Sequence, residues 1–280
     1  MALDARDPVQ LLGNALDAYA PAKIAERVAT AGVAKATLPL VPLFALAVLA
    51  GAFIAFGAVF YLAVTYQFGP GPGAAKLVGG IVFSLGLLLI VVGGAELFTG
   101  NNLIILARCD GLIGTGALLR NWSVVYAGNF AGAAATAVLI AMSGILGPET
   151  GEFSRHVQKI AAAKIALPYE QAFFRGILCN TLVCLAIWLC FACHTVTEKA
   201  VAVVFPISAF VTLGFEHSVA NMFFLPLGVL AGLPADAARI AGIAGNLAAV
   251  TAGNIVGGSV FVGVAYWIIY RRDARGSRVR

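Results

Sequence analysis

Long apolar stretches separated by short polar connections set the pattern of this chain. A helix needs about 20 apolar residues to cross a bilayer. Six stretches reach that length, at residues 38–66, 77–107, 121–147, 171–194, 200–232 and 238–270. The pattern predicts an all-α membrane protein with six transmembrane helices, which together form one domain over residues 38–271.

The segments that flank these spans are more polar. Residues 8–36 mix charged and apolar positions, as in an amphipathic helix that lies in the membrane interface. We therefore assign residues 1–37 to an N-terminal interfacial segment and residues 272–280 to a basic tail. The first residues show no basic run followed by an apolar core, so we expect no cleavable signal peptide.

Lysine and arginine are distributed unevenly over the predicted topology, in which six spans place both ends on one side. If that side is the cytoplasm, it holds Arg6, Lys23, Arg27, Lys35, Arg108, Arg120, Lys199, Arg271, Arg272, Arg275, Arg278 and Arg280. The other side holds Lys76, Arg155, Lys159, Lys164, Arg175 and Arg239. The positive-inside rule therefore predicts a multi-pass protein of a bacterial inner membrane, with both termini cytoplasmic.

The composition also favours lipid as the surrounding solvent. Of 280 residues, 61% are apolar and 11% are charged, and the mean hydropathy is +0.94. A soluble domain carries roughly 25% charged residues. The net charge of +5 is modest, and nucleic-acid binding, which needs a larger basic surface, is not expected.

Cysteine and histidine give no sign of a cofactor. The residues Cys190-Phe191-Ala192-Cys193-His194 match the haem-attachment pattern CxxCH, but they end a span on the predicted cytoplasmic side. The three histidines, His156, His194 and His217, lie in different segments, whereas a metal site needs about three clustered ligands. We predict no cofactor, no metal and no enzymatic activity.

The second and fifth spans share an interruption near their middle. The second contains Gly94-Ala95-Glu96, and the fifth contains Gly214-Phe215-Glu216; an asparagine follows each glutamate at the same offset. The third and sixth spans also share Ala-Gly-Asn, at residues 127–129 and 252–254. These echoes indicate two copies of a three-span unit, at 38–147 and 169–271. Because three is odd, the copies face opposite ways and form an inverted repeat.

Inverted repeats with broken helices are typical of transport proteins. A break in lipid leaves backbone N–H and C=O groups without partners, and this is tolerated only where protein or a wet cavity satisfies them. We expect Glu96 and Glu216 to brace the breaks by hydrogen bonding this freed backbone. The alternative is that these carboxylates act in permeation or proton relay.

Four polar residues are candidates for a substrate path. His217 lies beside the second break, where its imidazole can donate a hydrogen bond or a proton to an anion. Thr99 lies just past the opposite break, where its hydroxyl either donates to an anion or caps a helix. Lys164 precedes the fourth span, and at the mouth of a vestibule it would concentrate anions. Asn180 lies within the fourth span, as does Arg175, which needs a partner such as Glu170 or a neighbouring subunit.

Several of these stretches closely resemble the formate/nitrite transporter family. The run Val91-Val92-Gly93-Gly94-Ala95-Glu96-Leu97-Phe98-Thr99-Gly100 is similar to the first family signature. The run from Gly176 through Asn180 to Ala186 resembles the second, except that Thr181 stands where members usually have a bulky apolar residue. Residues 205–222 and 253–258 are similar to the family as well, so the likeness covers nearly the whole chain.

The resemblance implies an aquaporin-like subunit in a homopentamer, with one path for small monovalent anions, formate or nitrite, in each subunit. It places His217, Thr99, Lys164 and Asn180 along this path. It further implies two apolar constrictions, with Leu97 and Phe210 on one side of the histidine, Phe83, Leu87 and Phe98 on the other, and Val183 beside the outer slit. Protonation of the anion by His217 would let a neutral acid cross.

Other substrates and other kinds of protein remain as alternatives to a formate or nitrite path. Hydrosulfide or another small weak-acid anion would suit the same path. A neutral-solute channel is disfavoured because the chain has no paired Asn-Pro-Ala motifs. A structural or receptor role would leave both broken helices without a purpose.

Overall fold

The computed structural model describes residues 17–67 and 71–272, and in this part of the chain every regular element is a helix. The elements of the first half are α2 (Pro21–Thr37), α3 (Leu40–Thr65), α4 (Pro72–Phe83), α5 (Leu85–Gly93), α6 (Phe98–Asn101), η1 (Asn102–Ile104), α7 (Ile105–Cys109) and α8 (Thr115–Met142). Those of the second half are α9 (Glu152–Ile165), α10 (Tyr169–Ala192), α11 (Val196–Thr212), α12 (Ser218–Leu230), α13 (Ala237–Ile255), the π-helix η2 (Val256–Val264) and α14 (Ala265–Tyr270). The all-α prediction is confirmed. Residues 1–16 and 273–280, parts of the predicted interfacial segment and basic tail, lie outside the described residues.

Five helical stretches in the described residues are long and apolar enough to cross a membrane. They are Leu40–Thr65, Gly73–Gly93, Thr115–Met142, Tyr169–Ala192 and Ala237–Tyr270. The predicted fifth span is instead divided between α11, with 17 residues, and α12, with 13. A break in the middle of this span therefore leaves two half-helices, as the sequence predicts.

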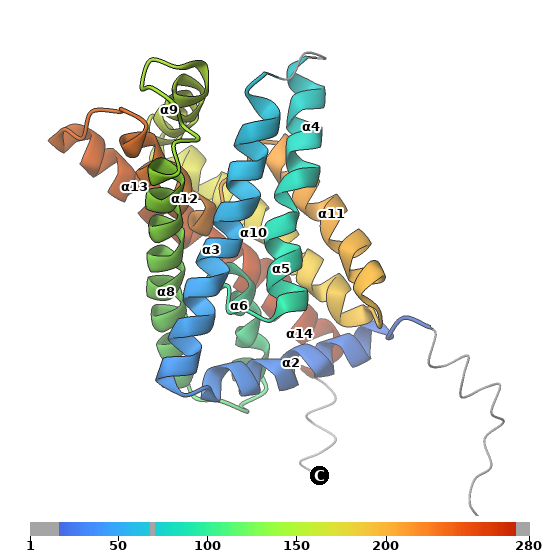
Figure 1. Ribbon diagram of the computed structural model, residues 1–280. Coiled ribbons are helices and arrows are strands. Elements are labelled where there is room, and N and C mark those ends of the chain that lie inside the picture. The colour runs from blue at the N-terminus through green and yellow to red at the C-terminus, as the bar shows by residue number, and fades with distance from the viewer. Residues whose placement is uncertain (1–16, 68–70, 273–280) are drawn as a thin grey trace, which may run out of the picture.

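Each half of the molecule begins with an amphipathic helix. α2 lies across the lower end of the molecule in Figure 1, and α9 lies at the upper end. α2 carries Lys35 and α9 carries Lys164, and each lysine forms an ion pair with the glutamate of the break in its own half. The two repeats therefore extend beyond residues 38–147 and 169–271, because each includes the amphipathic helix before its first span.

Glycine lets the first and last spans of each repeat approach closely. α3 packs along α8, and α10 packs along α13. A Cβ atom added to Gly132 of α8 would lie 1.9 Å from the carbonyl oxygen of Val48, and one added to Gly253 of α13 would lie 2.1 Å from that of Phe173. Contacts this close between helix backbones are typical of membrane proteins, where small residues form the interfaces.

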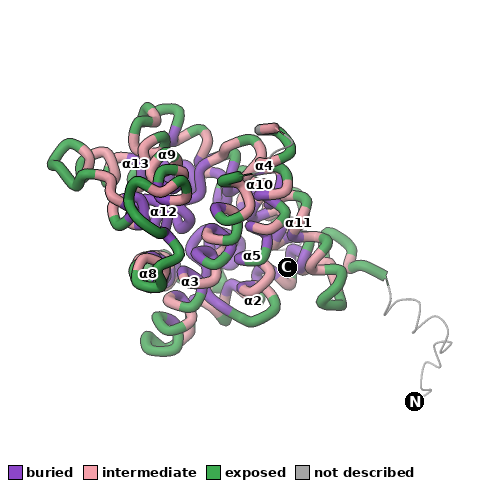
Figure 2. Tube along the Cα trace, turned by 45° about the horizontal axis from the view of Figure 1, so that its top comes forward, coloured by how far each residue is buried: buried purple, intermediate pink, exposed green. Residues whose placement is uncertain are grey.

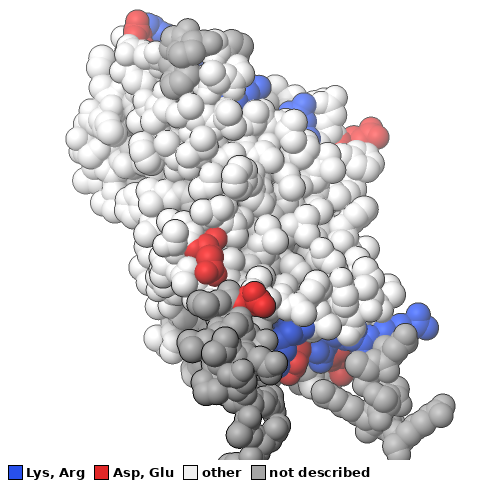
Figure 3. All heavy atoms as spheres, turned by 90° about the vertical axis from the view of Figure 1, so that its right-hand side faces the viewer, with Lys and Arg blue, Asp and Glu red and all other residues white. Residues whose placement is uncertain are grey.

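The interior and the surface are separated as expected for a membrane protein. Figure 2 shows the buried positions gathered toward the middle of the molecule, with exposed positions at its periphery. On the face shown in Figure 3, lysine and arginine lie toward the two ends, and the surface between them is mostly uncharged, with acidic side chains in its lower part. Many exposed residues are large and apolar, such as Val41, Leu139 and Phe205. This surface suits a lipid environment rather than water.

The close packing of α3 and α8 predicts the effect of adding one methyl group. We expect Gly132→Ala to destabilise the protein by about 1–3 kcal/mol, because two helix backbones must separate to accept it. Gly116→Ala, in the first turn of the same helix, is the control, because its Cβ would meet no atom within 4 Å. The measurement is thermal unfolding of each purified variant in one detergent. Equal melting temperatures for Gly132→Ala and the unmodified protein would contradict this account.

Candidate functional site

Two helix breaks meet in the middle of the molecule. α5 ends before Gly94, whose φ of 80° lies in the left-handed region, and the chain then runs extended to the start of α6. α11 likewise ends before Gly214, whose φ is 70°, and His217 caps α12. Glycine adopts this conformation without the steric cost of a Cβ atom. Both predicted breaks are confirmed.

Two buried asparagines hold the backbone that these breaks set free. In the first repeat, the Asn129 side chain accepts a 2.8 Å hydrogen bond from the N–H of Phe98 and donates a 2.9 Å bond to the carbonyl of Glu96. In the second, Asn254 accepts a 2.9 Å bond from the N–H of Ser218 and donates a 3.0 Å bond to the carbonyl of Glu216. Each asparagine thus clamps both sides of one break.

The expected role of the glutamate side chains therefore needs correction. We expect Glu96 and Glu216 from the sequence to hydrogen bond the freed backbone, but Asn129 and Asn254 do so. The carboxylates of the glutamates bond to lysine and asparagine side chains instead. The sequence signal for the asparagines was the shared Ala-Gly-Asn at residues 127–129 and 252–254.

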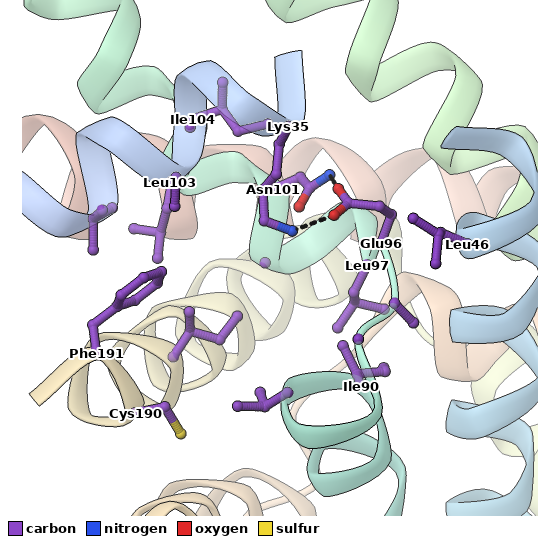
Figure 4. Close-up of a pocket in the computed structure, with 18 of the residues that line it drawn as sticks. Lys35, Leu46, Ile90, Glu96, Leu97, Asn101, Leu103, Ile104, Cys190 and Phe191 are labelled. Carbon is purple, nitrogen blue, oxygen red and sulfur yellow. Dashed lines mark hydrogen bonds and ion pairs between the residues drawn. The ribbon is translucent and has the colours of Figure 1, made fainter. Parts of the chain in front are cut away.

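The first glutamate belongs to a buried polar cluster that links α2 to the break (Figure 4). Lys35 donates to Glu96 at 2.5 Å, and Asn101 donates to the same carboxylate at 2.7 Å. Asn101 also donates to Asn121 at 2.9 Å, and Asn121 donates to the backbone carbonyl of Lys35 at 3.0 Å. These hydrogen bonds form a closed ring, which fixes Lys35 of α2 relative to Asn101 of α6.

The second glutamate forms the matching cluster in the other repeat. Lys164 donates to the two carboxylate oxygens of Glu216 at 2.9 and 3.1 Å, and Asn221 donates to Glu216 at 2.6 Å. Asn221 also donates to Asn246, which donates to the backbone carbonyl of Lys164 at 2.8 Å. Lys164 is therefore ion-paired rather than a free charge, and its side chain is only 16% exposed.

Thr99 and His217, one from each break, contact each other at the centre. The Thr99 hydroxyl oxygen lies 2.9 Å from Nε2 of His217. The backbone N–H of Ala220 donates to Nδ1 of the same ring at 3.1 Å, as the N-cap bond of α12. A nitrogen that accepts a hydrogen bond carries no proton, so in the neutral ring the proton is on Nε2 and is donated to Thr99. Both side chains are buried.

A cavity lies on each side of this central pair. The one beside α2, which we name the inner cavity after the orientation expected from the sequence, has a volume of about 380 Å³, and its polar lining comprises Arg27, Lys35, Glu96, Asn101 and Lys199. The outer one, beside α9, has a volume of about 220 Å³, and its polar lining includes Lys76, Lys164, Arg175, Glu216 and His217. In each cavity the cations outnumber the carboxylates. Both mouths therefore favour anions.

Aromatic and aliphatic side chains separate the cavities, with an arrangement that differs from the expected one. Phe210 and Phe83 both line the outer cavity and contact each other edge to face, with ring centroids 5.8 Å apart. Phe210 also stacks on the His217 ring at 6.0 Å. Leu97 lines the inner cavity. Phe210 therefore shares its side with Phe83, and the predicted grouping of Leu97 with Phe210 is wrong.

The remaining predicted residues are buried and line neither cavity. Phe98 packs against Trp122 and Tyr126. Leu87 and Val183 belong to the apolar core and line neither cavity. A closed constriction between two cavities need not line either of them, so the role of these three residues in a constriction stays a prediction.

Asn180 is occupied by the protein itself. Its side-chain amide donates to the carbonyl of Thr99 at 3.2 Å, to the side chain of Asn102 at 2.7 Å and to the carbonyl of Asn254 at 2.6 Å. It lines neither cavity. Asn180 thus joins the two repeats through the backbone of Thr99 and Asn254, and its place along a substrate path stays a prediction.

The fold and site define a membrane transport protein, with two inverted repeats, two broken helices and two cation-lined cavities, one of which is lined by the central imidazole. The sequence profile described as formate/nitrite transporter matches residues 22–268. This chain belongs to the formate/nitrite transporter family, a family of channels and transporters rather than enzymes.

Named relatives and solved structures agree with this assignment. The chain is 40% identical to "Formate channel FocA" of Escherichia coli (strain K12), over 93% of this chain and 97% of that protein. It is 39% identical to "Probable formate transporter" of Methanothermobacter thermautotrophicus, over 90% and 97%. The structure of a "Pentameric formate channel with formate bound" superposes with a TM-score of 0.74, at 38% identity, covering 82% of this chain and 97% of that one. An "FNT family ion channel" superposes with a TM-score of 0.82, at 32% identity, covering 88% and 98%.

The clamp formed by Asn129 predicts a large effect for a small substitution. We expect Asn129→Ala to destabilise the protein by about 1–3 kcal/mol, because the buried N–H of Phe98 then lacks an acceptor. The control is Ser123→Ala, an exposed position on the same helix. Thermal unfolding in detergent measures both. A melting temperature for Asn129→Ala within error of the control would show that the clamp does not hold the break.

Proposed function

We propose that this protein conducts small monovalent anions, formate or nitrite, across a bacterial inner membrane. The observation that carries the proposal is the Thr99–His217 pair, which lies between two cavities with an excess of cations. Relatives named formate channels, at about 40% identity over almost their full length, support formate. The solved channel with bound formate supports assembly as a homopentamer.

The charge distribution supports an orientation with both termini in the cytoplasm. α2 and the end of α14 lie at the same end of the molecule in Figure 1. Lys23, Arg27 and Arg108 lie in or beside the helices of that end, together with Arg271. An excess of basic residues marks the cytoplasmic side of a membrane protein. The α9 side, with Lys164, then faces outward.

The proposed path begins in the outer cavity. Lys76, Lys164 and Arg175 raise the local concentration of anions there. The Phe83–Phe210 pair then excludes bulk water and large hydrated ions, because apolar constrictions dewet easily. A bare anion in this constriction loses hydration at a high cost in free energy. The donors that offset this cost are Nε2–H of His217 and the hydroxyl of Thr99.

Proton transfer to the anion requires a change at His217. The neutral ring holds its proton on Nε2 and accepts from Ala220 on Nδ1. To act as an acid, the ring must first take up a second proton on Nδ1, which breaks that bond. A neighbouring anion stabilises the charged ring and so favours this step. We propose that the ring gains this proton on Nδ1 from water in the outer cavity and gives its Nε2 proton to the anion, which leaves the ring neutral. The anion then crosses to the inner cavity past Leu97 as a neutral acid.

The decisive experiment is anion flux in proteoliposomes at two values of external pH. We expect formate uptake to fall as external pH rises, because each anion enters with a proton. Nitrite, hydrosulfide and acetate are measured side by side, with an alkalinisation signal outside the vesicles for coupling. Formate and nitrite uptake no faster than in empty liposomes would contradict the proposed function.

The central imidazole predicts the loss of proton coupling on its removal. We expect His217→Ala to reduce proton-coupled formate uptake by at least about 100-fold, within the range typical of a lost acid–base group. The control is Cys179→Ala, a buried position in the same core that neither cavity contains. If His217→Ala moved formate and protons together at the normal rate, the relay would be wrong.

The ion pair between Lys164 and Glu216 predicts that replacing the lysine mainly changes the formate concentration that gives half of the maximum uptake rate. We expect Lys164→Ala to raise the Michaelis constant for formate more than it lowers the maximum rate, because the mouth loses a cation. The double variant Lys164→Ala, Glu216→Gln removes both charges of the pair and serves as the control for an unpaired buried carboxylate. We expect the double variant to regain part of the lost affinity. An unchanged concentration dependence in Lys164→Ala would remove this lysine from the path.

A further inference from the structure

One pair of equivalent positions breaks the symmetry of the two repeats. The backbone N–H of Glu96 donates to the carbonyl of Leu46 at 3.2 Å, and that of Glu216 donates to the carbonyl of Arg175 at 3.3 Å. Leu46 of α3 and Arg175 of α10 therefore occupy matching places beside the two breaks. Leu46 lines the inner cavity, and Arg175 lines the outer one. The lysine, glutamate and asparagine clusters match between the repeats, but this position does not.

The guanidinium of Arg175 leaves most of its N–H donors without a partner in the described part of the chain. Within residues 17–67 and 71–272, its side chain makes one hydrogen bond, from Nη1 to the carbonyl of Gly214 at 3.4 Å. No ion pair of Arg175 with a carboxylate occurs in that part of the chain. The nearby Glu216 is already bonded to Lys164 and Asn221. An arginine has five N–H donors, so most of them remain for a ligand in the cavity.

A purely structural role accounts for only part of this arrangement. The carbonyl of Gly214 follows the C-terminus of α11, where a cation is favourable to the helix dipole. A single hydrogen bond of 3.4 Å to this carbonyl does not require a side chain with five N–H donors. In the first repeat, the helix also ends at a left-handed glycine, Gly94, but the position that matches Arg175 is Leu46. The break itself therefore does not require an arginine.

We propose that Arg175, beside the Lys164–Glu216 ion pair, forms an anion-binding site of the outer cavity that selects planar monoanions with two oxygen atoms, such as carboxylates and nitrite. A guanidinium offers two parallel N–H donors, which match two oxygen atoms on one plane. The ammonium of a lysine is a point charge without that geometry. The site lies before the Phe83–Phe210 constriction, so it sorts anions before they lose their water. This inference rests on the proposed transport function and adds a specificity residue to it.

The asymmetry makes the site testable from the two sides separately. The outer cavity has the guanidinium and the inner cavity has Leu46 in its place. We expect Arg175→Leu, which copies the inner residue, to raise half-saturation by formate about tenfold, as expected for the loss of a hydrogen bond to a charged group. This change appears for formate presented from the outer side. Half-saturation from the inner side stays as in the unmodified protein, and the maximum rate changes little.

The experiment uses right-side-out and inside-out membrane vesicles that contain the full chain. Arg175→Lys keeps the charge but loses the two parallel N–H donors. We expect its half-saturating formate concentration to lie between those of the unmodified protein and Arg175→Leu. Arg239→Leu is the matched control, because Arg239 is an arginine of the α9 side that pairs with Asp236 and lies outside the cavity. We expect this control to leave both sides unchanged. A change of equal size on both sides in Arg175→Leu, or no change on either side, would overturn the proposal.

A binding measurement separates this proposal from the transport function. Formate should raise the melting temperature of the purified protein in detergent, and Arg175→Leu should need about tenfold more formate for the same shift. If the unmodified vesicles carried no formate, the transport function would fail, while the binding result would still decide the site. If Arg175→Lys bound formate as tightly as the unmodified protein, a single positive charge would be sufficient for binding. That result would contradict selection by the paired N–H donors of the guanidinium.

Discussion

The need to satisfy backbone polar groups inside a membrane governs this structure. Each break exposes N–H and C=O groups at a depth where water is scarce, and each unsatisfied group costs several kcal/mol. Asn129 and Asn254 meet this need with one side chain apiece, since an amide both donates and accepts. With the two breaks held in this way, the half-helices point their first turns at one another, and Thr99 meets His217.

The polar clusters around the glutamates follow from the same constraint. Glu96 and Glu216 are nearly buried, and a buried carboxylate is tolerated when it is paired and fully hydrogen bonded. Lys35 and Lys164 reach them from the amphipathic helices, so α2 and α9 are tied to the breaks rather than merely resting on the surface. The lysines therefore do two things at once: they stabilise the breaks and place positive charge at the cavity mouths. Arg175 then distinguishes the outer mouth from the inner one.

The fold could be predicted from the sequence because its signals are local and repeated. Apolar length defined the spans, and the shared Gly-x-Glu placed both breaks within a few residues of their positions in the structure. The equivalence of α2 and α9 was not predicted, because two amphipathic helices of different sequence share no motif. It became visible only through the partners of Lys35 and Lys164.

The site was predicted in part, for reasons that depend on side-chain direction. Thr99 and His217 form the central pair, and Lys164 and Phe210 line the outer cavity, since their positions next to a break or a cavity mouth fix where they lie. Asn180 and Phe98 line neither cavity, and no spacing rule in a fully apolar segment shows which helix face meets a cavity. The pairing of Leu97 with Phe210 failed because Leu97 follows the first break and Phe210 precedes the second, and the two residues line opposite cavities.

The most direct test of the central claim is a cryo-electron microscopy difference map of the protein in lipid nanodiscs, between samples in formate and in sulfate. The account predicts added density within hydrogen-bond distance of Nε2 of His217 and the Thr99 hydroxyl, between the two cavities. Density for formate confined to a route that does not pass this pair, with His217 sealed in side-chain packing in both maps, would contradict it.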